Sequence, residues 1–358
     1  MTPNQFMISN SNDPSIGFAL QGTVVDASIR LTPAQLQQVS DQYLTFRPEE
    51  QPLHAKDQRV VDTKIHEATH ALLQKMGVSH EILWSSGGSL ANSAKAAAKF
   101  GAQCVLAGMT GNDSYSQLYR QILGNQGINT DFLTQQEGKG CVCTALLTDD
   151  RCMLTDWGTV GMLPYHPTDD FYRDQKLVAV ESYLAQVPGV PSRVLYDATR
   201  KHIPTVFGAG SVQNVQKSDY LKLLQEKTIT YFFATEEELL QLTHMDTLQQ
   251  AAKSVGQYVS TVFATRGVNG VGVYTSGSFT SSSVQDLVPP DQVVDKLGAG
   301  DYFQGGVMAG IVKEFSLEDS VHFGGLCAAQ IIRTQGTDLQ KEQVKLLRKK
   351  FEEFKPSR

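Results

Sequence analysis

The chain has 358 residues, of which 41% are hydrophobic and 19% are charged, and its formal net charge is −6. This length is enough for one large or two modest domains with a substantial buried core. No block of lysine and arginine is present to follow a phosphate backbone, so we expect no nucleic-acid partner. No uninterrupted apolar run approaches the roughly 18 residues of a membrane-spanning helix, so we expect no membrane partner.

The first residues and the cysteines indicate the cellular compartment of the protein. Residues 1–15 are polar and lack the basic region and apolar segment of a signal peptide. The 5 cysteines are odd in number and have no paired C-x-x-C spacing, which fits reduced thiols better than a disulfide framework or a zinc knuckle. The sequence therefore predicts a cytoplasmic protein.

Strand-like apolar runs alternate with helix-like periodic segments along most of the chain. This alternation predicts βαβ units and a mostly parallel sheet with helices on both faces. Two segments rich in β-forming residues, 17–31 and 140–158, contain no helix and predict antiparallel hairpins in a small second sheet. We expect helices at 33–43, 62–76, 90–101, 114–127, 236–243, 248–259 and 341–354, and strands at 104–109, 193–198, 230–234, 261–267 and 293–295.

His66, Glu67 and His70 match the H-E-x-x-H pattern, in which two histidines one helical turn apart bind zinc. The extended form of this pattern fails because Leu73 and Met76 stand where its glycine and third histidine belong. A zinc hydrolase is thus one hypothesis, but an amphipathic helix that carries the histidines on its flank is the simpler interpretation.

The sequence DKLGAGD, residues 295–301, lies between a strand-like segment and an apolar helix that begins at about Asp301. Gly298 and Gly300 permit positive φ and close backbone approach, so successive N–H groups can form an anion site at the helix N-terminus. Asp301 would then stand beside a bound phosphate, where a carboxylate can accept the proton of an attacking hydroxyl group. A turn in which Asp301 only caps the helix is the alternative.

DKLGAGD closely resembles the D-x-x-G-A-G-D signature of the ribokinase-like (PfkB) family of sugar and nucleoside kinases. Other segments resemble family motifs in the same order, and the resemblance spans roughly residues 17–340. They are residues 86–101 for G-G-x-x-x-N-x-A, 108–133 for G-x-x-G-x-D, 235–243 for N-x-x-E and 264–274 for T-x-G-x-x-G.

This resemblance implies one kinase domain over residues 1–358. The implied fold is the ribokinase-like three-layer α/β/α arrangement, with a mostly parallel central sheet and a small β-sheet lid from about 17–31 and 140–158. The implied enzyme is a phosphotransferase that moves the γ-phosphoryl group of ATP to a hydroxymethyl group. Some members of the family form homodimers through this lid.

The resemblance also implies roles for individual residues. Asp301 matches the catalytic base, and the backbone of Gly298, Ala299 and Gly300 matches the anion hole. Glu238 matches the glutamate that helps to place Mg²⁺ and its waters. In many members K⁺ or another monovalent cation binds near the first aspartate of the signature. The positions that match nucleotide contacts are Asp295, Lys296, Thr265, Gly267, Gly270, Ala328 and Ala329.

The acceptor is expected to be a sugar or a nucleoside. Asp26 matches the family aspartate that holds two sugar hydroxyls, and Gly87, Gly88 and Asn92 match the rest of that site. The serine after Gly88 and the Asn-Ser pair resemble adenosine-kinase-like members, which favours an adenosine-like or ribosyl acceptor. Candidate aromatic side chains for a purine are Phe18, Trp84 and Trp157, with core or lid packing as the alternative.

Three positions depart from the family pattern. Lys296 replaces a threonine after the first signature aspartate, and Thr235 replaces the asparagine of N-x-x-E. The residues before Asp26 also match the family poorly. These departures leave a second hypothesis open, a catalytically weak or inactive regulatory protein that binds nucleotide or sugar on the same fold.

Overall fold

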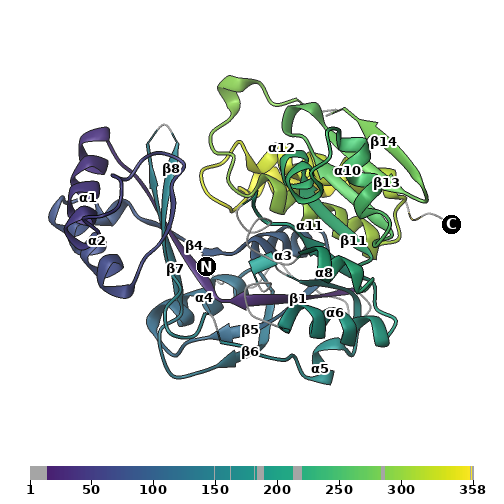
Figure 1. Ribbon diagram of the computed structural model, residues 1–358, viewed down its shortest axis with the longest axis horizontal. Coiled ribbons are helices and arrows are strands. Elements are labelled where there is room, and N and C mark those ends of the chain that lie inside the picture. The colour runs from purple at the N-terminus through teal and green to yellow at the C-terminus, as the bar shows by residue number, and fades with distance from the viewer. Residues whose placement is uncertain are drawn as a thin grey trace.

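The computed structural model describes residues 14–148, 150–161, 163–180, 182–183, 189–212, 220–283, 287–354 and 356. Two β-sheets organise these residues (Figure 1). The larger has nine strands in the order β14-β13-β12-β11-β10-β9-β1-β5-β6, and the smaller has five in the order β3-β8-β7-β2-β4.

The large sheet is parallel from β6 to β12 and ends in an antiparallel hairpin, β13–β14. Its central strands are buried on both faces, as the continuous apolar runs in the sequence predict. The strands are β1 (Ser15–Gly22), β5 (Gln103–Thr110), β6 (Asn129–Gln135), β9 (Gln175–Val180), β10 (Thr205–Gly208), β11 (Tyr231–Thr235), β12 (Thr261–Thr265), β13 (Val271–Thr275) and β14 (Ser278–Ser282).

Helices cover both faces of the large sheet, which confirms the predicted three-layer arrangement. On one face pack α3 (Ser89–Lys99), α4 (Ser114–Gly124), α11 (Ala299–Val312), α12 (Leu317–Ile331) and α13 (Lys341–Glu353). On the other pack α5 (Asp169–Tyr172), α6 (Val190–Arg200), α8 (Tyr220–Gln225), α9 (Glu236–Thr243) and α10 (Leu248–Val255). Among the helices that the structure describes, none is both long enough and apolar enough to span a membrane.

The small sheet projects from one side of the body, with two helices on its outer face (Figure 1). A capping box between Thr32 and Gln35 starts the first of these helices, and Asp62 caps the second. The elements are β2 (Val24–Arg30), β3 (Gln58–Val60), β4 (Leu83–Gly87), β7 (Cys141–Leu147), β8 (Arg151–Asp156), α1 (Pro33–Phe46) and α2 (Thr63–Lys75). Single 3₁₀ turns lie at Ser79–Glu81, Gly267–Asn269 and Pro290–Gln292.

The prediction that all of residues 17–31 belongs to the small sheet is wrong. Strand β1 runs through the middle of the large sheet, and only β2 enters the small one. The chain changes sheets at Thr23, whose N–H bonds to the carbonyl of Met109 and whose carbonyl accepts the N–H of Cys141. Moreover, β2 pairs in parallel with β7, so the expected hairpin geometry holds only for β7 with β8.

Two predicted strands are also absent. Residues 193–198 lie in helix α6, where Val190, Val194 and Ala198 recur at helical spacing on the buried side. A six-residue apolar window cannot distinguish a buried strand from a helix of this kind. Residues 293–295 form no strand; they follow a 3₁₀ turn and lead directly into the glycine-rich segment.

Helix α11 is packed tightly between α3 and α12 because glycines replace side chains where the helices touch. A Cβ on Gly305 would lie 2.4 Å from the carbonyl oxygen of Ser93 on α3. A Cβ on Gly306 would lie 2.9 Å from the sulfur of Cys327 on α12. This close packing fixes the position of the first turn of α11.

We therefore expect Gly305→Ala to destabilise the protein, because the new methyl group would collide with the α3 backbone. Such overpacking costs about 1–3 kcal/mol of unfolding free energy, measurable by urea denaturation. Gly325→Ala on α12 is the matched control, because a Cβ at that position would have no neighbour within 4 Å. It should leave stability unchanged or raise it by up to about 1 kcal/mol. Equal effects of the two changes would contradict the packing argument.

Candidate active site

The carboxylate of Asp301 joins the start of α11 to the start of α3. Ser89 donates its hydroxyl hydrogen bond to Oδ1 at 2.8 Å, and Asn92 donates from Nδ2 to Oδ2 at 2.9 Å. Ser93 donates to the backbone carbonyl of Asp301 at 2.9 Å. The side chain of Asp301 thus faces the residues expected to bind the acceptor, as a general base would.

Burial raises the pKa of Asp301 above its usual range, although the hydrogen bonds from Asn92 and Ser89 oppose this rise. A carboxylate with a raised pKa is a stronger proton acceptor than an exposed aspartate, provided that it is ionised. The nearby cationic side chains of Lys95 and Arg151 favour the ionised form.

Asp26 lies beside the Gly-Gly turn that precedes α3. A Cβ on Gly87 would lie 2.2 Å from Asp26 Oδ1, so only glycine fits against this carboxylate. The following Gly88 has φ 89° and acts as the N-cap of α3, a conformation that favours glycine. Burial raises the pKa of Asp26 to about 7. The positive charge of Lys95 lowers this pKa, and the negative charge of Asp301 raises it.

The expected acceptor residues therefore converge. Asp26, Gly87 and Gly88 meet at one end of the small sheet, and Asn92 connects them to Asp301. The Oδ1 atom of Asn92 is buried and has no hydrogen-bond partner within the described part of the chain. A ligand hydroxyl group would satisfy it.

On the other side of the α11 N-terminus lies a large, mainly apolar cleft of about 1460 Å³. Gly298 has φ 76°, and helix α11 begins at the next residue. Ala299 and Gly300 line the cleft, so the N–H groups of the first helical turn lie at its wall. Of the expected nucleotide positions, those that line the cleft are Lys296, Thr265, Gly267, Gly270, Ala328 and Ala329.

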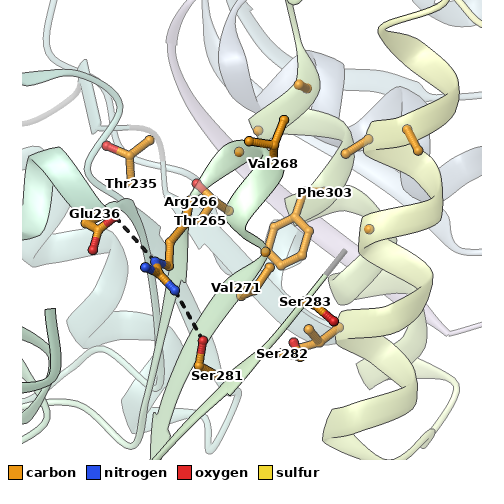
Figure 2. A pocket seen from close by; sticks show the side chains of 18 of the residues that line it. Thr235, Glu236, Thr265, Arg266, Val268, Val271, Ser281, Ser282, Ser283 and Phe303 are labelled. Carbon is orange, nitrogen blue, oxygen red and sulfur yellow. Dashed lines mark hydrogen bonds and ion pairs between the residues drawn. The ribbon is translucent and has the colours of Figure 1, made fainter. Parts of the chain in front are cut away.

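Figure 2 shows Arg266 between two elements at this cleft. Its guanidinium lies 3.3 Å from the Glu236 carboxylate at the start of α9 and 3.3 Å from the Ser281 hydroxyl on β14. Glu236 directly follows β11 and Arg266 directly follows β12, so this ion pair connects the ends of two neighbouring strands at the wall of the cleft.

Asp295 does not line this cleft; its carboxylate organises the loop behind it. It accepts the N–H of Leu297 at 2.9 Å and the N–H of Gly336 at 3.2 Å. It also lies 4.0 Å from the guanidinium of Arg151, which extends from strand β8 of the small sheet. Arg151 thereby brings a positive charge from the small sheet to the signature loop.

Glu238 lies in the first turn of α9, where Thr235 is the N-cap. The Thr235 hydroxyl accepts the N–H of Glu238, and Glu238 Oε2 accepts the N–H of Thr235 at 2.8 Å. The replacement of asparagine by Thr235 therefore produces a capping box. The neighbouring Glu236 and Glu237 line the cleft, whereas Glu238 is only 8% exposed and burial raises its pKa.

The histidines of the H-E-x-x-H pattern lie on the outer side of the small sheet. His66 and His70 point to one hydroxyl, Thr144 Oγ1, from 3.1 Å and 2.9 Å respectively. His66 is buried rather than on the flank, and Glu67 pairs with Lys139 instead of facing the histidines. Among the described residues no group of three or more histidine, cysteine or acidic side chains could hold a metal ion.

The candidate purine-binding aromatics are dispersed. Phe18 is fully buried in the core, and Trp157 contacts Tyr183 with ring centroids 6.1 Å apart. Trp84 stacks on His70 with centroids 5.9 Å apart, on the same side of the small sheet as Thr144. The structure therefore does not bring these three rings together around a purine.

The sequence assigns no role at the site to three residues that lie there, Ser89, Lys95 and Arg151. Ser89 and Lys95 lie on α3 within the glycine motif, but nothing in the sequence indicates that they approach Asp301. Arg151 lies in the small sheet, far from residue 301 in the chain. Its position as the first residue of the alternating strand β8 is the only signal.

A glycine-rich helix start lies between an apolar cleft and a cluster of polar side chains, with the carboxylate of Asp301 on the side of that cluster. This arrangement suits phosphoryl transfer to a hydroxyl group. The comparisons with known proteins agree. A family model described as pfkB family carbohydrate kinase matches residues 66–343. The chain belongs to this family, and it is a phosphotransferase that acts on a hydroxyl group. Kinases of this family use ATP and typically Mg²⁺.

Individual relatives are similar over most of the chain. Adenosine kinase of Saccharomyces cerevisiae is 27% identical over 309 residues, which cover 82% of this chain and 91% of that protein. Ribokinase of Arabidopsis thaliana is 24% identical over 264 residues, 70% of this chain and 68% of that protein. A solved structure of adenosine kinase from Sinorhizobium meliloti has a TM-score of 0.78 at 20% identity, and the match covers 94% of this chain and 99% of that one. The predicted ribokinase-like fold is confirmed.

The histidine pair should make stability depend on pH. Burial, the largest cause, lowers the pKa of His66 to about 3 from an ordinary value of 6.5, and burial also lowers that of His70. Each native imidazole therefore stays neutral where the unfolded one takes up a proton. The contribution of this pair to stability should therefore be fully present above about pH 6.5 and decline as the pH falls toward 3, because the unfolded state then binds more protons.

We expect His66→Gln to reduce this loss of stability between pH 6.5 and 4. One such histidine contributes a slope of up to about 1.4 kcal/mol per pH unit. Urea denaturation at several pH values measures it. The exposed His80 provides the control, because His80→Gln should keep the wild-type slope. A His66→Gln slope equal to that of the wild type would contradict the burial argument.

Proposed function

We propose that this kinase transfers the γ-phosphoryl group of ATP to a hydroxymethyl group of a nucleoside or related ribosyl acceptor, with adenosine favoured. The observation that carries the proposal is the position of Asp301, between the α11 N-terminus at the cleft and the acceptor residues Ser89 and Asn92. The similarity to adenosine kinases and ribokinases supports this class of acceptor.

In the proposed reaction, Asp301 accepts the proton of the acceptor hydroxyl as its oxygen attacks the γ-phosphorus of ATP. The bond from that phosphorus to the β-γ bridging oxygen breaks, and ADP leaves. The N–H groups at Gly298, Ala299 and Gly300 would stabilise the negative charge on the transferring group. That of Ala299 has only a long hydrogen bond in this structure, 3.4 Å to the carbonyl of Lys296. Arg151 adds a positive charge from the small sheet.

The nucleotide would occupy the 1460 Å³ cleft, with its base against the apolar wall formed by α12 and strand β13. The nucleotide positions named from the resemblance other than Asp295 line this cleft; Asp295 would act through the signature loop. Thr265, Gly267 and Gly270 lie at the end of β12, and Lys296 is exposed at the phosphate side.

Mg²⁺ fits this arrangement, because it usually keeps several waters and needs only one or two carboxylates besides the substrate phosphates. Glu238 would hold these waters, near the acidic lining of the cleft at Glu236 and Glu237. The ion would neutralise charge on the β- and γ-phosphates. The second oxygen of Glu238 remains for this role, since Oε2 caps α9. A monovalent cation near Asp295 remains part of the proposal.

The acceptor would lie against Asp26, with Gly87 and Gly88 close to the sugar ring and Asn92 Oδ1 accepting from a hydroxyl group. An ionised Asp26 can accept two hydroxyl hydrogen bonds, as a ribose diol offers. The small sheet would exclude water from this pocket, since water is the competing nucleophile.

The primary experiment is an ATP-consumption screen with adenosine, inosine, ribose and fructose, with phosphorylated product confirmed by mass spectrometry. On the acceptor that is turned over, Asp301→Asn should lower kcat by about 10²- to 10⁴-fold, because the proton acceptor is lost. Asp319→Asn is the matched control, because Asp319 occupies the same third position of helix α12. Equal rates for Asp301→Asn and the wild type, or no acceptor turned over, would refute the proposal.

Asp26→Asn should weaken acceptor recognition specifically. Loss of hydrogen bonds to a charged group costs about 1.5–3 kcal/mol, or roughly 10- to 150-fold in kcat/KM for the acceptor, while KM for ATP stays unchanged. Because burial raises the pKa of Asp26 to about 7, wild-type kcat/KM should also fall as the pH drops below about 7. Asp131→Asn, at an exposed position on β6, is the control. An equal loss for both substrates would contradict this role.

A further inference from the structure

Lys95 is a fully buried lysine, with 0% of its surface exposed, on helix α3 two turns after the Gly-Gly entry. Its ammonium donates to the carbonyl oxygen of Ser86 at 3.2 Å and to Thr337 Oγ1 at 2.9 Å. It also lies 3.4 Å from Asp338 Oδ1. A buried charge is costly even when it is paired, so its presence here calls for a reason beyond packing.

The two hydrogen bonds of this ammonium reach both halves of the site. Ser86 immediately precedes Gly87, the residue that packs against the carboxylate of Asp26. Thr337 lies against the anion hole, because its methyl carbon would be 3.2 Å from a Cβ on Gly298. The carbonyl of Thr337 also accepts the hydroxyl of Tyr302, the residue after the proposed base.

The same ammonium acts electrostatically on the carboxylates of Asp26 and Asp301. Burial lowers the pKa of Lys95 itself, and the negative charges of Asp338, Asp26 and Asp301 oppose this. Lys95 lowers the pKa of Asp26 and that of Asp301, against the rise that burial causes, while Asp301 raises the pKa of Asp26. Without a cation, burial and the repulsion between the two negative charges would favour a proton on one of the carboxylates. A proton on Asp301 would remove the base.

We propose that Lys95 is a positioning residue of the phosphoryl transfer, whose positive charge, paired with Asp338, keeps Asp26 and Asp301 ionised together while the acceptor binds. Arg151 is the other cation that acts on both carboxylates, but it extends from the small sheet. Lys95 belongs to α3 and is present whether or not that sheet closes. The inference rests on the proposed function of Asp301 and Asp26.

Lys99, one helical turn further along α3, offers a matched control. Its ammonium donates to Gln126 Oε1 at 2.8 Å, and the charge of Asp338 acts on it as on Lys95. The cations that lower the pKa values of Asp26 and Asp301 are Lys95 and Arg151, and not Lys99. Lys95 pairs with Asp338 directly, whereas Lys99 reaches it through Gln126, whose Nε2 donates to Asp338 Oδ1 at 3.0 Å. Lys99→Met therefore removes a neighbouring buried cation of α3 while the direct pair of Lys95 with Asp338 remains.

The test compares the dependence of kcat/KM on pH, from 5.5 to 9.5, for Lys95→Met, Lys95→Gln and Lys99→Met. Removal of a nearby opposite charge raises a carboxyl pKa by up to about one to three units. Both Lys95 variants should therefore shift the acidic limb of the profile upward by that amount and recover activity at high pH. Lys99→Met should keep the wild-type limb.

Lys95→Gln separates charge from position, because an amide can still donate to the Ser86 carbonyl. If its acidic limb stays at the wild-type pH, the charge is not needed and the proposal is overturned. Circular dichroism and thermal unfolding establish which variants are folded. If Lys95→Met does not fold, Lys95→Gln alone decides the outcome.

A second measurement does not depend on catalysis. The carboxyl ¹³C resonances of Asp26 and Asp301, assigned with Asp26→Asn and Asp301→Asn, are titrated in the wild type and in Lys95→Gln. Higher carboxyl pKa values in Lys95→Gln support the inference even if no acceptor is phosphorylated. Unchanged values overturn it even if Asp301→Asn proves inactive, so failure of this inference and failure of the proposed function are distinguishable.

Discussion

The hydrogen bonds from Ser89 and Asn92 to the Asp301 carboxylate are the constraint on which the rest of the site depends. They fix one helix start against another, so the Gly-Gly turn and the glycine-rich turn face each other across a single carboxylate. Such precision requires that α3 and α11 approach closely along their length. Gly305 permits this approach, because any side chain there would meet the α3 backbone. The packing of α11 at Gly305 thus determines the position of the Asp301 carboxylate at the start of the same helix.

Burial of the site creates an electrostatic conflict. Exclusion of water strengthens every charge interaction that phosphoryl transfer needs, but it also favours the neutral form of each carboxylic acid. Both Asp26 and Asp301 show this tendency toward a raised pKa. The structure opposes it in two ways, with hydrogen-bond donors on Asp301 and with two cationic side chains near both acids. One of these cations is fixed in α3, and the other belongs to the small sheet.

The part of the site that could be predicted from the sequence is the part encoded locally. DKLGAGD and the Gly-Gly entry each form one turn, so their spacing alone indicates the backbone conformation. Ser89, Lys95 and Arg151 could not be assigned in this way, because their importance arises from contacts with residues more than 100 positions away. The same limit explains the errors in the fold. Nothing local distinguishes β1 from β2 as members of different sheets, and the window 193–198 is too short to reveal that α6 is a helix.

In the H-E-x-x-H segment, the residue spacing determines where the histidines lie, and the surrounding residues determine what they bind. A separation of four residues on α2 does place His66 and His70 on one face, with ring centroids 4.4 Å apart, as a zinc site would require. That face, however, meets strand β7 of the small sheet, where Thr144 presents a hydroxyl that can donate to one imidazole and accept from the other. Two neutral histidines in different tautomers satisfy this arrangement. The two histidines therefore connect α2 to the small sheet. Their role is determined by their tertiary partner, Thr144, rather than by their spacing.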